Sequence, residues 1–228
     1  MDELQMTKAK SGFACVTVDA PKYMESPAKD TKQSQLIYLI GGNDGKVLNQ
    51  VEILEYPSCQ WRQAAPMLHK RDELAACIGP DKKIYVVGGY GGGDNTCLDS
   101  AERYDPTTNT WEELCSLSQG RRALSIVALP DGIYAVGGFS GKSYISSVER
   151  YDIQADKWTL VSPMLSPKCT LSCVVSQPDY RYIYAIGGFN GEPLDEVERY
   201  DVTEEKWQKM DSSMKQKRFM HSTLIVSI

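Results

Sequence analysis

Short apolar runs separated by turn residues follow one another along the whole chain, most clearly in its middle. Residues 124–129 are apolar, and the Pro-Asp-Gly sequence at 130–132 is typical of a turn before the next apolar run at 133–136. Residues 147–152 alternate between polar and apolar side chains, and 157–160 form a further β-prone run. The pattern predicts four short strands joined by turns, which is a β-meander sheet.

This unit occurs four times, and each copy has a Gly-Gly doublet after its second strand and a Trp about twenty residues later. A period of 47 to 50 residues indicates a repeated supersecondary unit. A four-stranded sheet with two apolar faces has to stack on neighbouring sheets, which favours a β-propeller blade. The doublets are Gly41-Gly42, Gly88-Gly89, Gly137-Gly138 and Gly187-Gly188, and the tryptophans are Trp61, Trp111, Trp158 and Trp207.

Further co-spaced features carry a family resemblance. The third strand ends in Tyr-Asp in three units, and a basic residue lies four positions after a Met or Leu that follows the Trp. Together with the doublets and tryptophans, this pattern resembles the kelch repeat over nearly the whole chain. The resemblance implies an all-β kelch β-propeller in which the repeated glycines and aromatics are structural. We expect one domain, 1–228, with four complete four-stranded blades at about 10–63, 71–114, 121–161 and 168–209, and a terminal strand at 219–227.

Both ends predict a fragment of a larger propeller. The spacing between Met6 and Lys10 matches that between Met67 and Arg71, so counting back places a missing Trp before Met1. The chain would then begin at the tail of a fourth strand and end on a first strand. Propellers have roughly 4–8 blades, and kelch domains commonly have about six. We therefore expect an N-terminal truncation of a propeller that is six-bladed in full.

Composition limits the classes of function that this chain could have. The net charge of −5 gives no indication of nucleic-acid affinity, and no apolar run is long enough for a membrane helix. Seven cysteines, an odd number, without a Cys-x-x-Cys motif indicate a reduced, cytoplasmic protein. His69 and His221 are the only histidines and lie in different repeats, so we expect no metal site, no catalytic triad and no cofactor.

Candidate binding residues gather on one face. In a meander, the loops between strands two and three share a face with the blade-to-blade loops, and loops carry function on rigid scaffolds. Basic groups beside aromatic side chains suit a peptide, in particular an acidic one. The alternative is that each repeated basic residue neutralises a Glu of a neighbouring blade or bonds a loop carbonyl. The predicted partner-binding residues are Arg71, Arg121, Arg122, Lys168, Arg218, Tyr90, Phe139, Tyr144, Phe189 and Asn190.

The resemblance favours a protein-interaction module over an enzyme. It points to kelch domains that recruit substrates to cullin-based ubiquitin ligases, normally behind a BTB domain, which this sequence does not contain. A cytoskeletal kelch protein that binds actin is one alternative, and a kelch-fold enzyme acting on a small molecule is another. The long polar loop at 19–35 predicts either disorder or a second docking site.

Overall fold

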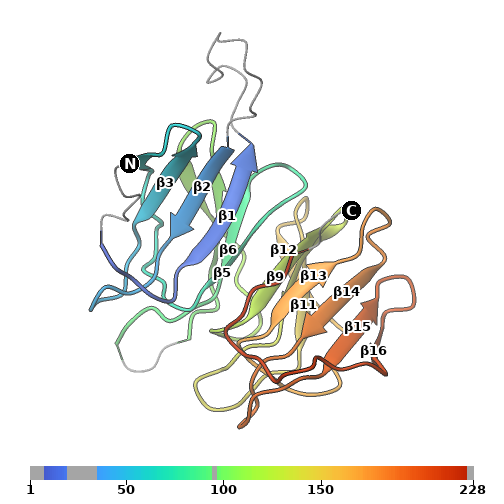
Figure 1. Cartoon of the computed structure of the whole chain (residues 1–228). Coiled ribbons are helices and arrows are strands. Elements are labelled where there is room, and N and C mark those ends of the chain that lie inside the picture. The colour runs from blue at the N-terminus through green and yellow to red at the C-terminus, as the bar shows by residue number, and fades with distance from the viewer. Residues whose placement is uncertain (1–7, 20–34, 94–96, 225–228) are drawn as a thin grey trace.

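Strands and loops make up the computed structural model, which describes residues 8–19, 35–93 and 97–224. Within these ranges, sixteen strands form four separate sheets, each antiparallel and each in sequence order (Figure 1). No helix in these ranges is long and apolar enough to cross a membrane. The strands are β1 (Ala14–Asp19), β2 (Gln35–Ile40), β3 (Val51–Tyr56), β4 (Gln60–Gln63), β5 (Ala75–Ile78), β6 (Ile84–Val87), β7 (Ala101–Asp105), β8 (Thr110–Leu114), β9 (Ser125–Leu129), β10 (Gly132–Val136), β11 (Val148–Asp152), β12 (Lys157–Val161), β13 (Ser172–Val175), β14 (Tyr182–Ile186), β15 (Val197–Asp201) and β16 (Lys206–Lys209).

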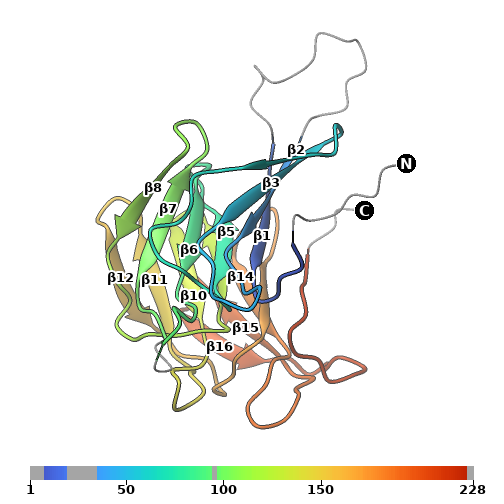
Figure 2. The same cartoon turned by 90° about the vertical axis from the view of Figure 1, so that its left-hand side faces the viewer.

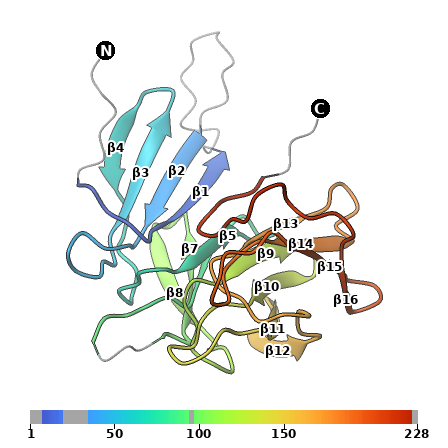
Figure 3. The same ribbon diagram turned by 60° about the horizontal axis from the view of Figure 1, so that its bottom comes forward.

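The four sheets are arranged as propeller blades. The first strands β1, β5, β9 and β13 lie toward the middle of the molecule, and β4, β8, β12 and β16 lie at the periphery (Figure 3). Innermost strands of consecutive blades contact one another, and successive sheets stack face to face (Figure 2). The predicted all-β class and four-stranded blades are therefore confirmed.

Apolar side chains from neighbouring blades form the core. Tyr85 and Tyr151, from the second and third blades, have ring centroids 6.1 Å apart, and both side chains are buried. The repeated Trp bonds back to the segment just after the fourth strand of the preceding blade, because its indole N–H needs an acceptor when it packs in a core. These bonds run from Trp111 to the carbonyl of Ala65 (2.8 Å), from Trp158 to that of Cys115 (2.9 Å) and from Trp207 to that of Ser162 (2.9 Å).

The Gly-Gly doublet allows two backbones to approach closely. Gly137 has φ +63°, and a Cβ on it would lie 2.7 Å from the carbonyl oxygen of Lys168. The next amide, that of Gly138, donates to the same oxygen at 2.9 Å. A larger residue would be strained and would collide with that backbone. The doublet thus fixes the end of each second strand against the segment that leads into the next blade.

One predicted strand does not form over its described part. Residues 219–224 have no strand assignment, and 225–227 lie outside the described residues. Each of the four first strands pairs only with the second strand of its own blade, and the segment after Arg218 has no such partner among the described strands. Most of the long loop predicted at 19–35, residues 20–34, also lies outside the described ranges.

Candidate binding pocket on the loop face

Each of four crossing segments (64–74, 115–124, 162–171 and 210–221) follows the fourth strand of a blade, and the first three lead into the next blade. Their last turns are linked by backbone hydrogen bonds, with the amide of Ala123 donating to Glu73 at 2.9 Å and that of Thr170 donating to Ala123 at 2.7 Å. Met220 continues the series by donating to Thr170 at 3.0 Å. All four residues have a left-handed φ of 50–52°. The crossing segments therefore form a linked layer on one face of the propeller.

The loops after the second strands lie in the same layer, as the meander predicts. Arg122 exchanges two backbone hydrogen bonds with Phe139 at 3.0 and 2.9 Å, and Cys169 exchanges two with Phe189 at 3.0 and 2.9 Å. Each pair joins a crossing segment to the residue that follows a Gly-Gly doublet. Side chains from these two kinds of loop are thereby brought side by side.

Three of the predicted binding residues are buried, which overturns their assignment to a partner surface. Arg71, Arg121 and Lys168 are each 0% exposed. A guanidinium or ammonium group without access to solvent cannot reach a partner. Their partners are Glu102 (2.8 Å from Arg71), Glu149 (2.6 Å from Arg121) and Glu198 (2.6 Å from Lys168).

Each of these carboxylates also binds the backbone of a crossing segment. Glu102 accepts from the amide of Leu68 at 2.6 Å, and Glu149 accepts from that of Ser118 at 2.9 Å. Burial lowers the pKa of Arg121, while its attraction to Glu149 opposes that shift. The guanidinium stays charged because the ordinary pKa of arginine is so high. Arg71, Arg121 and Lys168 therefore hold the crossing segments in place, as the structural alternative proposed.

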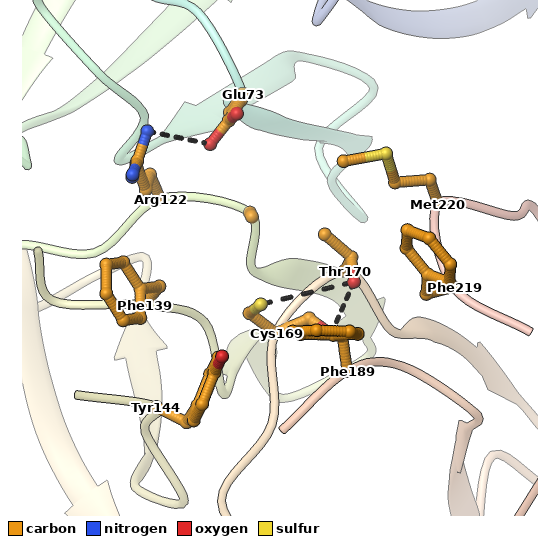
Figure 4. Close-up of a pocket in the computed structure, with 10 residues that line it drawn as sticks. Glu73, Arg122, Phe139, Tyr144, Cys169, Thr170, Phe189, Phe219 and Met220 are labelled. Carbon is orange, nitrogen blue, oxygen red and sulfur yellow. Dashed lines mark hydrogen bonds and ion pairs between the residues drawn. The ribbon is translucent and has the colours of Figure 1, made fainter. Parts of the chain in front are cut away.

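Four predicted residues do come together, around a pocket of about 280 Å³ (Figure 4). They are Arg122, Phe139, Tyr144 and Phe189. The pocket lies among crossing segments and loops of successive blades, so residues far apart in sequence converge there. Six further lining residues were not predicted: Glu73, Ala123, Cys169, Thr170, Phe219 and Met220.

Aromatic rings form a continuous row along the pocket. Ring centroids are 5.4 Å apart between Phe139 and Tyr144, and 6.0 Å apart between Tyr144 and Phe189. Phe219 extends the row, 5.5 Å from Phe189, and its side chain is exposed. Met220, beside it, is 73% exposed. Such partly exposed aromatics offer large apolar contact area at low entropic cost, as protein-binding hot spots do.

The two charged side chains of the lining, Glu73 and Arg122, lie at one end of the pocket and face each other (Figure 4). Their nearest charged atoms, Glu73 Oε2 and Arg122 Nη1, are 3.4 Å apart. The Arg122 guanidinium also lies over two rings, 5.8 Å from the centroid of Tyr90 and 5.5 Å from that of Phe139. These contacts hold the cation at the pocket edge.

The remaining predicted residues lie elsewhere on this face. Tyr90 supports Arg122, as described above, without lining the pocket itself. Arg218 is exposed, and its backbone bonds to Leu194 and Gly188. Asn190 lies in the turn after Phe189, where its amide donates to Glu192 at 3.3 Å. Neither Arg218 nor Asn190 is among the lining residues of the pocket.

Strand alternation is the signal that would have found the missing residues. Successive side chains of an extended segment point to opposite sides, so the residue after a buried basic residue faces outward. Arg122 and Cys169 follow the buried Arg121 and Lys168, and both line the pocket, whereas Phe219 follows Arg218, which is exposed. The sequence marks them only by this offset, because their types differ from repeat to repeat.

Four ionisable side chains line the pocket: Glu73, Arg122, Tyr144 and Cys169. Burial raises the pKa of the Cys169 thiol, so the reactive thiolate is disfavoured. No histidine is among the lining residues. Within the described part of the chain, no group of three His, Cys, Asp or Glu residues could hold a metal ion. The lining offers apolar surface, one guanidinium and one carboxylate.

Comparison with known proteins identifies the family. A family model described as the KLHDC2/KLHL20/DRC7 kelch-repeats domain matches residues 28–227. The chain belongs to the kelch-repeat family. The kelch fold agrees with a solved structure titled "Structure of YjhT", which superposes with a TM-score of 0.70 over 94% of this chain and 70% of that one, at 14% identity.

Curated relatives of the kelch domain are longer proteins. Kelch-like protein 7 of Rattus norvegicus is 42% identical over 94 residues, which are 41% of this chain and 16% of that protein. Kelch-like protein 35 of Mus musculus is 32% identical over 71% of this chain and 27% of its own length. Kelch repeat and BTB domain-containing protein 13 of Homo sapiens is 32% identical over 50% of this chain and 25% of its own length. The chain thus spans under a third of each of these relatives.

Proposed function

We propose that this kelch domain is a protein-interaction module that holds a peptide segment of its partner in the aromatic pocket. The observation that carries the proposal is the pocket itself, where Phe139, Tyr144 and Phe189 remain partly exposed beside a guanidinium. A pocket near 300 Å³ is large enough for one or two side chains of a partner. The four blades provide the rigid scaffold on which such loops bind.

We further propose that the partner is a substrate of a cullin-based ubiquitin ligase, delivered by a longer protein that includes a BTB domain. The kelch-like relatives support this role, and one of them carries both domain names. All seven cysteines are free thiols, which is consistent with a reducing compartment such as the cytoplasm. Recovery of a cullin with the full-length protein, but not with a version without its BTB domain, would test this part.

The pocket is tested by blocking it from its exposed edge. Met220→Asp puts a carboxylate at the rim with little risk to folding, because this side chain is exposed and Asp tolerates a left-handed backbone. Leu160→Asp, at a side chain that is also exposed but lies on β12 away from the pocket, is the matched control. The ligands are dodecapeptides selected by phage display from a random library on the unmodified chain.

We expect Met220→Asp to weaken binding of the selected peptides by at least about tenfold, because an apolar ligand group would bury an unpaired charge. Leu160→Asp should leave binding unchanged. Thermal unfolding confirms that both variants are folded. Equal binding by the two variants would contradict the proposed pocket.

A further inference from the structure

Two consecutive arginines use their hydrogen-bond donors in different ways. The terminal nitrogens of Arg121 donate to the carbonyls of Gly137 and Ser147, to the Ser147 hydroxyl and to Glu149, over 2.6–3.1 Å. Across the described residues, the side chain of Arg122 makes no hydrogen bond, and its one ionic contact is Glu73. Arg122 therefore has donors available to a ligand.

The contact between Arg122 and Glu73 is loose. At 3.4 Å, the closest approach of the charged atoms is longer than a charge-assisted hydrogen bond, which is about 2.7–2.9 Å. The side chains of Arg122 and Glu73 are 28% and 34% exposed. Partly exposed ion pairs of this kind contribute little to stability. The pair can therefore be opened by a better-placed carboxylate.

The two members of the pair differ in how firmly they are held. The Arg122 guanidinium lies over the rings of Tyr90 and Phe139, while the Glu73 carboxylate has Arg122 as its one ion-pair partner among the described residues. A fixed, planar guanidinium can donate two parallel hydrogen bonds to a carboxylate. A flexible anion can swing toward solvent. A ligand anion at Arg122 is thus favoured over a ligand cation at Glu73.

We propose, on the basis of the proposed pocket function, that Glu73 pairs with Arg122 in the free protein and that an acidic residue of the partner displaces it. The recognised segment has an Asp or Glu close to a bulky apolar side chain. The carboxylate binds Arg122, and the apolar side chain packs along Tyr144, Phe189 and Phe219 at the other end of the pocket (Figure 4). Because the ligand has to displace Glu73 from Arg122, a ligand that has only the carboxylate or only the apolar side chain binds weakly.

The experiment uses the dodecapeptides selected on the unmodified chain, each synthesised with its acidic residues intact or changed to Asn or Gln. Dissociation constants are measured by fluorescence polarisation for the unmodified chain, Arg122→Gln and Glu73→Gln. Because both side chains are partly exposed and weakly paired, both variants should fold, which urea unfolding checks. Met220→Asp serves as the pocket-blocked reference.

In the unmodified chain, neutralising the peptide carboxylate should weaken binding about tenfold or more, since a hydrogen-bonded charge pair is lost. Arg122→Gln should remove this difference. Glu73→Gln should tighten binding of the acidic peptide about threefold or more, because no internal carboxylate competes. This gain distinguishes displacement of Glu73 from simple attraction to a basic surface.

Each failure has a separate meaning. Peptides that lose affinity in Met220→Asp but show no preference for acidic residues would leave the pocket function intact and overturn the acidic specificity. Weaker binding of acidic peptides to Glu73→Gln would overturn the role of Glu73 as a competitor. Selected peptides that bind Met220→Asp as well as the unmodified chain would overturn the proposed function and this inference with it.

Discussion

Arg121 and Arg122 are neighbours in the sequence but belong to two different regions of the molecule. Arg121 is buried between blades and fixes a crossing segment through Glu149, whereas Arg122 faces the pocket with unused donors. The difference follows from strand alternation, which turns one side chain inward and the next outward. At this pair, the repeated charge is part of the scaffold, and the charge beside it is free for binding.

The largest expected effect comes from removing the inner member of this pair. Arg121→Met leaves the Glu149 carboxylate buried without its cation, so we expect the free energy of unfolding to fall by about 3–5 kcal/mol. Arg122→Met should change it by only about 0.5 kcal/mol, as for most surface substitutions. Urea unfolding of both variants measures the contrast. Similar losses in the two would show that the division between scaffold and pocket is wrong.

A smaller effect tests the other link between blades, the Trp hydrogen bond. The Trp111 indole donates to Ala65, whereas the indole nitrogen of Trp61, also half-buried, has no hydrogen-bond partner among the described residues. Trp111→Phe should therefore cost about 1 kcal/mol more unfolding free energy than Trp61→Phe. Chemical denaturation gives both values. Equal losses of unfolding free energy in the two variants would mean that the repeated Trp stabilises the fold through packing alone, without a contribution from its hydrogen bond.

The last expected effect is a dependence of stability on acid pH. Burial acts to raise the pKa of Glu196, but its bonds to Lys168 and Ser166 outweigh burial and lower the pKa to about 2. A carboxyl whose pKa is lowered on folding stabilises the protein above its ordinary value of 4.5, and this stabilisation is lost as the pH falls from 4.5 toward 2. We expect the free energy of unfolding of Glu196→Gln to be lower than that of the unmodified chain at pH 7. The difference between the two should be smaller near pH 3.

The matched control for the acid experiment is Glu192→Gln. Glu192 lies near Glu196 in the chain, and its ion pair with Lys217 is exposed on both sides. Exposed pairs contribute roughly 0–1 kcal/mol, so this variant should follow the unmodified chain at both pH values. A gap for Glu196→Gln that stays constant between pH 7 and pH 3 would rule out the titration of Glu196 as the cause.

Most of the fold could be predicted from the sequence, because its signals are local and repeated. The alternation in 147–152 and the turn at 130–132 each fix one short element, and the fourfold recurrence of Gly-Gly and Trp removes ambiguity. The terminal strand at 219–227 was the exception over its described part. A strand needs a hydrogen-bonding neighbour, and the local sequence does not show whether one is present.

The candidate site was predicted only in part, for a related reason. Residue type alone does not separate Arg71, which is buried against Glu102, from Arg122, which lines the pocket. Glu73 and Met220 belong to no repeated pattern of residue types, although both occupy the same left-handed position of a crossing segment. Their relation to the pocket depends on how consecutive blades are placed.

The sequence by itself determined the kelch repeat, the number of complete blades and the face on which loops gather, because hydrophobic periodicity and turn residues act over a few positions. Only the tertiary structure decided which basic residues are buried in the core and which line the pocket. Burial depends on the neighbouring blade, and the ion pair with Glu149 forms between residues 28 positions apart. The pocket exists because stacked blades bring Arg122, Phe189 and Phe219 together from separate repeats.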